Sequence, residues 1–266
     1  MKDVVALQLW QFSLVYLLLI IVLAVMRLCR IDRSKLLIIA SLRMSLQLTL
    51  AGLVLTYIFK NPHPAYTLAY LAGMTGFAIY RVLSQNKGLN RRFQWIIALS
   101  IAFSGLMVLV FFISVVVGES LFDPQYVIPI AGMLMGNTMT GATLGVKTFR
   151  ESLSSQRARI DALLNIGASP AKALMPFIRQ ALETALLPTL NSMVGMGIVS
   201  LPGMMTGQIL SGTLPTTAIL YQIAIMVAIC ATVCLSSFGA LYFGFKTLYN
   251  RRNQILWQTD NTPAKG

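Results

Sequence analysis

The sequence predicts an all-α fold, a polytopic integral membrane bundle of about seven transmembrane helices with one short helix on its cytoplasmic side. Three observations lead to this prediction. Hydrophobic residues make up 56% of the 266 residues and charged residues only 11%, and the mean hydropathy is +0.73, which is outside the range of soluble globular domains. Apolar runs of roughly 20 residues, enough to cross a bilayer, recur along the chain. Positive charges gather on alternate connections between these runs.

The apolar runs define the predicted spans, which in chain order are 5–29, 36–59, 65–83, 95–117, 126–146, 178–201 and 216–245. The first span follows only Lys2 and Asp3 and lacks a small-residue cleavage site, so we expect a retained helix rather than a signal peptide. No segment remains for a soluble domain. We therefore expect residues 1–257 to form a single transmembrane domain and the polar residues 258–266 to form a short flexible tail.

The net charge of +13 could indicate a nucleic-acid partner, but its distribution does not. Lys and Arg cluster after every second span, at 27–35, 81–92, 147–179 and 246–265. The opposite connections carry only Lys2 and Lys60. Because basic loops stay in the cytoplasm, we expect a multi-pass protein of the plasma (inner) membrane. Its amino terminus would lie outside and its carboxyl terminus in the cytoplasm. The partner that the charge pattern implies is a lipid bilayer, with no nucleic acid.

Residues 161–170, DALLNIGASP, predict a sharp elbow between two helices. The first helix has an apolar stripe at i, i+3, i+4 and i+7, formed by Ile160, Leu163, Leu164 and Gly167. Gly167 is placed to end this helix, and Ser169 followed by Pro170 to cap and begin the next one. We expect the apolar stripe to enter a pocket on a partner protein outside the membrane.

This elbow resembles the cytoplasmic coupling loop of ABC transporter permeases, in which an acid, two small or apolar residues, three variable residues and a glycine follow one another. Asp161, Ala162, Leu163 and Gly167 match that pattern, with Asp in place of the usual Glu and Leu in place of the second Ala. Other runs are similar to the FetB family of iron-export permeases, related to plant aluminium-tolerance permeases: VIPIAGMLMGNTM from Val127, LPTLNS from Leu187, VSLPGMMTGQILSG from Val199 and YQI from Tyr221.

The resemblance implies the permease subunit of an ABC transporter that exports iron or another metal ion. It implies two copies of this chain, as a homodimer, with two copies of a separate ATPase subunit. ATP and Mg²⁺ would bind to that partner, because the connection at 147–177 is too short for an ATPase, and this chain would hold no cofactor and carry out no catalysis. An energy-independent channel or secondary carrier for a metal or small solute is the alternative. It is disfavoured because charged relay residues near the midplane are nearly absent.

Span 126–146 is the first candidate for a wall of the translocation pathway. It carries small and polar residues at helical spacing, and we favour Asn137 and Thr140 for exposure to the pathway. A buried amide would otherwise need a partner inside the bundle. Close packing of helices through small residues is the alternative interpretation.

Span 178–201 is the second candidate. Its polar or small residues share one helical face, namely Thr184, Pro188, Asn191 and Gly195. Pro188 bends the helix, so the span could carry motion from the elbow to a cavity, or it could be a kinked packing helix. Members of the FetB family often carry an acid and a base where this chain has Asn191 and Val194, which leaves the exported species less defined.

Two further groups complete the candidate site. Arg43 lies about seven residues into its span with Gln47 one turn deeper, and a charge at that depth costs a few kcal/mol unless it is paired or faces water. Arg43 therefore either snorkels to the headgroups or faces the bundle. The candidate gate is the run Pro202, Gly203, Met204 and Met205. Its thioethers could favour soft ions or fill packing gaps, and no set of metal ligands is predicted.

Overall fold

A computed structural model describes residues 9–249, and this part of the chain is helical with no β-strand. The long helices are α1 (Leu9–Leu28), α2 (Ser34–Lys60), α3 (Pro64–Gln85), α4 (Arg91–Phe111), α5 (Pro124–Ser155), α7 (Pro170–Gly195) and α9 (Pro215–Phe238). The short helices are α6 (Arg157–Asn165), α8 (Gly203–Leu210), the π-helices η1 (Phe112–Val117) and η2 (Gly239–Phe243) and the 3₁₀-helix η3 (Phe245–Thr247). The all-α prediction is confirmed, and the predicted tail at 258–266 lies outside the described residues.

Four of these helical segments are long and apolar enough to cross a membrane: α2, α4 with η1, α5, and α9 with its η2 and η3 extension. The described apolar part of α1 is shorter, and α3 and α7 have the length but not the composition. The chain is thus built as a multi-pass membrane protein. A count of seven spans stays a prediction.

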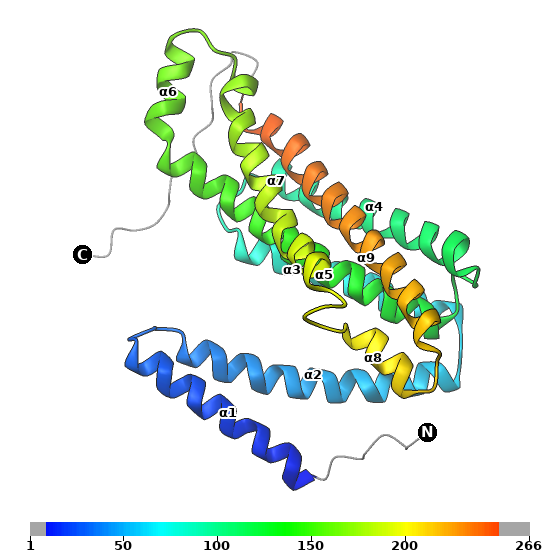
Figure 1. Ribbon diagram of the computed structural model, residues 1–266. Coiled ribbons are helices and arrows are strands. Elements are labelled where there is room, and N and C mark those ends of the chain that lie inside the picture. Colours follow the sequence, from blue (N-terminus) through cyan, green and yellow to red (C-terminus); the bar gives the residue numbers. More distant parts are fainter. Residues whose placement is uncertain (1–8, 250–266) are drawn as a thin grey trace.

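Helix α5 is the centre of the bundle and packs against α3, α4, α7 and α9 (Figure 1). Its seam with α7 is tight: a Cβ added at Gly141 would lie 3.0 Å from the Ala185 carbonyl oxygen, and one at Gly145 would lie 3.2 Å from that of Ala181. Since the residue numbers run in opposite directions, the two helices are antiparallel. The close-packing interpretation of small residues therefore holds for this row of α5.

Helices α1 and α2 form a hairpin beside the main bundle (Figure 1). The side chains described on them are exposed or half-buried apart from Ile58, which is buried. Tyr16 hydrogen-bonds Ser45 between the two helices at 2.5 Å. Contact with the bundle runs from α2 to α5 and through Arg43, whose guanidinium carbon lies 5.7 Å from the ring centroid of Phe77 on α3. In a membrane, lipid or another polypeptide must cover the rest of the apolar surface of the hairpin.

The sixth predicted span has different bounds from the helix that the structure contains. The helix begins at Pro170 rather than 178 and ends at Gly195 rather than 201. Gly197 follows with φ +83°, a left-handed conformation in which a helix cannot continue. Residues 196–202 therefore form a loop that leads into α8, so the chain turns back near the end of α7.

Candidate coupling elbow and translocation pathway

The elbow between α6 and α7 has the geometry that its sequence predicts. Gly167 adopts φ +88°, its N–H donates to the Leu164 carbonyl at 3.0 Å, and the N–H of Ala168 donates to the Leu163 carbonyl at 3.0 Å. These two bonds form a Schellman motif. Ser169 Oγ then accepts from the Lys172 N–H at 3.4 Å, and α7 begins at Pro170. The turn is therefore fixed by local backbone bonds.

Two residues of the predicted apolar stripe of α6, Ile160 and Leu164, lie against the chain's own bundle, while Leu163 is half-buried and Gly167 is exposed. Ile160 is 0% exposed and belongs to a core cluster with Phe149, Leu174 and Phe177, and Leu164 packs against that cluster. Ile160 and Leu164 therefore fasten α6 to the chain's own bundle, and contact of the rest of the stripe with a partner stays a prediction. A surface helix buries its apolar face wherever one is available, and the end of α5 and the start of α7 supply it here.

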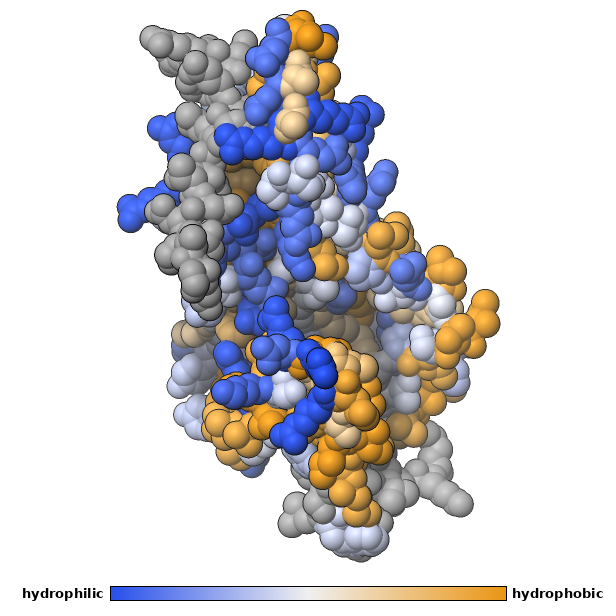
Figure 2. All heavy atoms as spheres, turned by 90° about the vertical axis from the view of Figure 1, so that its left-hand side faces the viewer, coloured by the Kyte–Doolittle hydropathy of each residue, from blue (hydrophilic) through white to orange (hydrophobic). Residues whose placement is uncertain are grey.

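The surface that the elbow leaves free lies at its tip. Ile166 is 80% exposed, and the neighbouring Ala162 and Gly167 are also exposed. Asp161 is half-buried, with its carboxylate 3.9 Å from Arg157. Figure 1 places α6 at the far end of the bundle, and Figure 2 shows an apolar patch there surrounded by hydrophilic surface. An exposed apolar tip with a charged rim suits contact with another protein.

One face of α5 is polar and exposed along its middle. Gly136, Asn137 and Thr140 are exposed, and no atom lies within 4 Å of a Cβ added at Gly136. The Asn137 amide donates to the Met133 carbonyl at 2.8 Å and the Thr140 hydroxyl to the Gly136 carbonyl at 3.1 Å. Both side chains thus satisfy a donor on their own helix without needing a partner from a neighbouring one.

Helix α4 gives the contrast. Its exposed side chains are large and apolar, including Trp95, Leu99, Phe103 and Met107, as expected for a surface in contact with lipid. Met135, on the side of α5 that is turned away from the polar face, packs against Gly105 of α4. The polar face of α5 is thus directed away from α4.

Helix α7 borders the same open face. Pro188 and Asn191 are exposed, while Thr184 and Gly195 are half-buried. An α-helix turns by about 100° per residue. By that rotation, these four residues are displaced from the Ala181–Ala185 contact in the same sense as Gly136, Asn137 and Thr140 are displaced from Gly141 and Gly145. In antiparallel helices that places both sets on one side of the seam. The structure therefore brings the two predicted walls of the pathway together.

Arg43 and Gln47 lie on α2, which contacts α5. Both are exposed, and Arg43 is directed to Phe77 of α3 rather than only to the membrane surface. A cation over an aromatic face is stabilised by about 0.5–1 kcal/mol at exposed sites. Of the two alternatives, this contact favours a bundle-facing role for Arg43.

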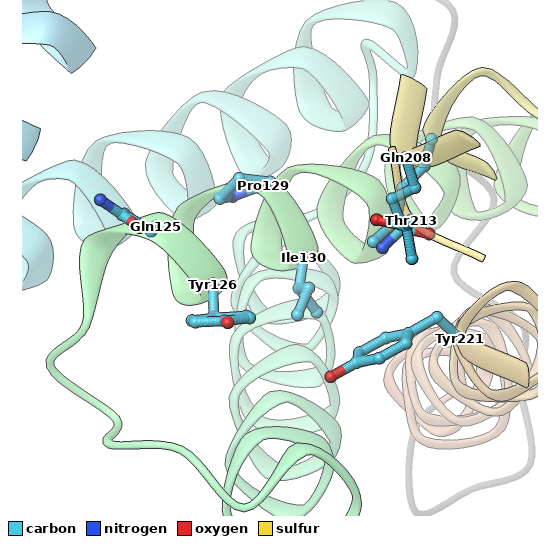
Figure 3. Close-up of a pocket in the computed structure, with 8 residues that line it drawn as sticks. Gln125, Tyr126, Pro129, Ile130, Gln208, Thr213 and Tyr221 are labelled. Atoms are coloured by element: carbon cyan, nitrogen blue, oxygen red, sulfur yellow. The ribbon is translucent and has the colours of Figure 1, made fainter. Parts of the chain in front are cut away.

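The candidate gate begins α8. Pro202 occupies the N-cap position and Gly203 is the first helical residue. Met205 is buried, and Met204 is half-buried and packs against a core cluster. Met204 lines a cavity of about 220 Å³ with residues that the sequence analysis did not select (Figure 3): Gln125, Tyr126, Pro129, Ile130, Gln208, Thr213 and Tyr221. No group of three or more His, Cys, Asp or Glu side chains suited to a metal lies together within residues 9–249.

The fold and this site define the class: a multi-pass helical membrane protein whose central helix α5 has a polar, exposed face. The chain belongs to the group described as "Uncharacterised protein family (UPF0014)", whose family model matches residues 9–249. The predicted resemblance is therefore confirmed.

Three relatives show how far the similarity extends. The "Probable iron export permease protein FetB" of Escherichia coli K12 is 34% identical over 215 residues, 80% of this chain and 82% of the relative. "Protein ALUMINUM SENSITIVE 3" of Arabidopsis thaliana is 32% identical over 213 residues, 80% of this chain and 77% of the relative. "UPF0014 membrane protein YjkA" of Bacillus subtilis is 29% identical over 226 residues, 84% and 88%. No solved structure matches the chain. The name of the Escherichia coli relative points to transport rather than to catalysis.

Proposed function

We propose that this chain is the permease subunit of an ABC transporter that exports iron or another metal ion, powered by ATP hydrolysis on a separate subunit. It would act as a homodimer with two ATPase copies, in the plasma (inner) membrane, with its amino terminus outside and its carboxyl terminus in the cytoplasm. The observation that carries the proposal is the rigid elbow between α6 and α7, because α7 runs from that elbow directly along the polar face of α5.

The elbow suits a mechanical role. Its turn is held by the Schellman bonds of Gly167 and Ala168 and by the cap of Ser169. Its inner side is anchored by Ile160, which is fully buried. A push on the exposed tip at Ile166 would therefore move α6 and the start of α7 together rather than unwinding the turn. In this proposal the ATPase receives Ile166, Ala162 and the charged rim.

The polar face of α5 supplies the route. Asn137 and Thr140 offer oxygen atoms, and Thr184 and Asn191 border them from α7. Conduction needs contacts that are favourable enough to admit an ion but weak enough to release it. Uncharged oxygen atoms on a face without a carboxylate would bind a cation weakly enough to release it.

A second copy of the chain would close the route on its open side. The outer end of α7 and the following loop expose large apolar side chains, with Val194 81%, Ile198 90% and Val199 85% exposed. Such a surface is consistent with burial against a second protomer as well as against lipid.

The proposal is tested by ATP-driven transport. The chain and its candidate ABC ATPase are reconstituted in vesicles with the ATPase side outward, and Fe²⁺ accumulation is measured under anaerobic conditions. We expect accumulation against a gradient only when ATP and both subunits are present. Matched vesicles that contain the permease alone are the control. Movement of Fe²⁺ down its gradient through the permease alone, unchanged by ATP, would favour the channel or carrier alternative.

A further inference from the structure

Three basic side chains gather where α4 begins. Arg91 and Arg92 are exposed in the first turn of α4. Helices α4 and α9 lie side by side (Figure 1), so the η3 extension of α9 reaches the start of α4. There the Asn90 side chain donates to the Thr247 carbonyl at 3.1 Å, which brings the exposed Lys246 next to the two arginines. Arg91, Arg92 and Lys246 are called the basic cluster below.

No acidic side chain balances the basic cluster within the described part of the chain. The sequence contains no Asp or Glu from 33 to 118 or from 184 to 249, so α3, α4, α9 and η3 have none. The ion pairs among residues 9–249 join Lys147 to Glu151 and Arg157 to Asp161. Two arginines in the first turn of a helix also lie where its dipole disfavours a cation. The cluster therefore favours an anion from outside the chain.

The exposed face of α4 continues from the arginines as an apolar stripe. Trp95 follows Arg91 by four residues and Arg92 by three, so the three side chains are neighbours on one face of the helix. Leu99 and Phe103 extend this face in steps of four, and the three apolar side chains are 76%, 69% and 66% exposed. Tryptophan is typical of the depth of the lipid head groups, towards which Arg and Lys also extend. The face is thus cationic at one end and apolar along the rest.

We propose that the basic cluster and this stripe form a binding site for an anionic phospholipid. The phosphate would lie between Arg91, Arg92 and Lys246, and an acyl chain would follow Trp95 and Leu99. Guanidinium groups pair bidentately with phosphate oxygen atoms, and basic sites beside membrane helices bind anionic head groups. An acidic protein would use only the charged end, whereas a lipid matches the charge and the apolar stripe together. The inference does not depend on iron as the cargo or on ATP hydrolysis.

The test uses Trp95 as a fluorescent reporter of its lipid neighbours. The full chain, with Trp10 and Trp257 changed to phenylalanine, is reconstituted in phosphatidylcholine vesicles that contain a minor fraction of phosphatidylglycerol. Bromine on an acyl chain quenches tryptophan at short range. It is carried by phosphatidylglycerol in one set of vesicles and by the same mole fraction of phosphatidylcholine in the other. We expect stronger quenching in the first set, because the basic cluster would enrich phosphatidylglycerol beside Trp95.

The double variant Arg91→Gln, Arg92→Gln should lose most of this preference. One basic side chain near an anionic head group changes affinity about fivefold, so two should change it roughly 25-fold. The matched control is Lys172→Gln with Arg179→Gln, which removes the same charge from exposed positions on α7 and should keep the preference. Vesicles in which all phosphatidylcholine is brominated check that Trp95 of each variant still contacts lipid.

Three outcomes would overturn the site. Equal quenching of the unaltered chain by the two brominated lipids would leave the cluster to an acidic protein or to topology alone. An undiminished preference in the folded arginine variant would show that these side chains do not select the lipid. An equal loss of preference in the α7 control would show that the total charge of the chain attracts the lipid.

Discussion

Two isoleucines on and after α6 can show whether anchoring the elbow to the bundle and coupling it to the ATPase are separate roles. Ile160 is 0% exposed and Ile166 is 80% exposed, so the same change to alanine should have different effects at the two positions. Ile160→Ala leaves a cavity in a packed cluster, and such changes cost about 2–5 kcal/mol. Only about a fifth of Ile166 is covered. Since full burial of an isoleucine contributes about 1.5–3 kcal/mol, Ile166→Ala should cost at most about 0.6 kcal/mol of stability.

The assay combines thermal unfolding in nanodiscs with ATP-driven metal transport per folded transporter. Ile160→Ala should lower the unfolding temperature. Ile166→Ala should keep it but reduce transport and weaken ATPase association, because the exposed tip is lost. Two results would refute this reasoning: wild-type transport by Ile166→Ala, or an unchanged unfolding temperature for Ile160→Ala.

Three further predictions concern the polar face, the helix seam and the topology. Thr140→Val should reduce transport because it removes a pathway hydroxyl. The control is Thr138→Val on the opposite side of the same helix, which removes a buried hydroxyl that has no hydrogen-bond partner among the described residues. This variant should keep transport, and its stability should be equal or higher. Similar transport by the two variants would contradict the assignment of faces. Gly141→Ala should destabilise the bundle by about 1–3 kcal/mol, because the added Cβ would lie 2.5 Å from a methyl carbon of α9 and 3.0 Å from a carbonyl oxygen of α7. The control is Gly136→Ala, whose added Cβ has no atom within 4 Å. Equal unfolding temperatures of the two variants would argue against the seam between α5 and α7. A cysteine placed at Ser155 should react with an impermeant maleimide only after cells are permeabilised, and labelling in sealed cells would reverse the proposed orientation.

Local signals made the elbow predictable from the sequence. Gly167, Ser169 and Pro170 each fix backbone geometry within a few residues, and the structure contains the turn they predict. The direction of the apolar stripe was not predictable in the same way. Ile160 and Leu164 have the same helical spacing whether they cover the chain's own core or a partner's surface, so the spacing alone could not show that these two side chains pack on the chain's own core.

Long-range contacts explain the other differences. The end of α7 was placed too late because apolar residues continue past Gly195 and Gly197, and only the backbone conformation shows that the helix stops. The cavity beside Met204 joins Tyr126 to Tyr221, which are far apart in the sequence. Tyrosine is common near the ends of membrane helices, so no sequence pattern indicated that these two should be paired. A buried amide oxygen without a partner among the described residues, such as that of Gln208, is visible only in three dimensions.

The most direct measurement of the central claim is the accessibility of the α5 face to water and to metal. In a chain with Cys29, Cys230 and Cys234 replaced, single cysteines are placed at Asn137 and, as a control facing lipid, at Phe103 of α4. Reaction with a small water-soluble thiol reagent is then measured with the ATPase present. The proposed pathway predicts that the cysteine at 137 reacts, that ATP changes its rate and that Fe²⁺ protects it, while the cysteine at 103 stays unreactive. Equal, metal-independent reactivity at both positions would contradict a translocation pathway along α5.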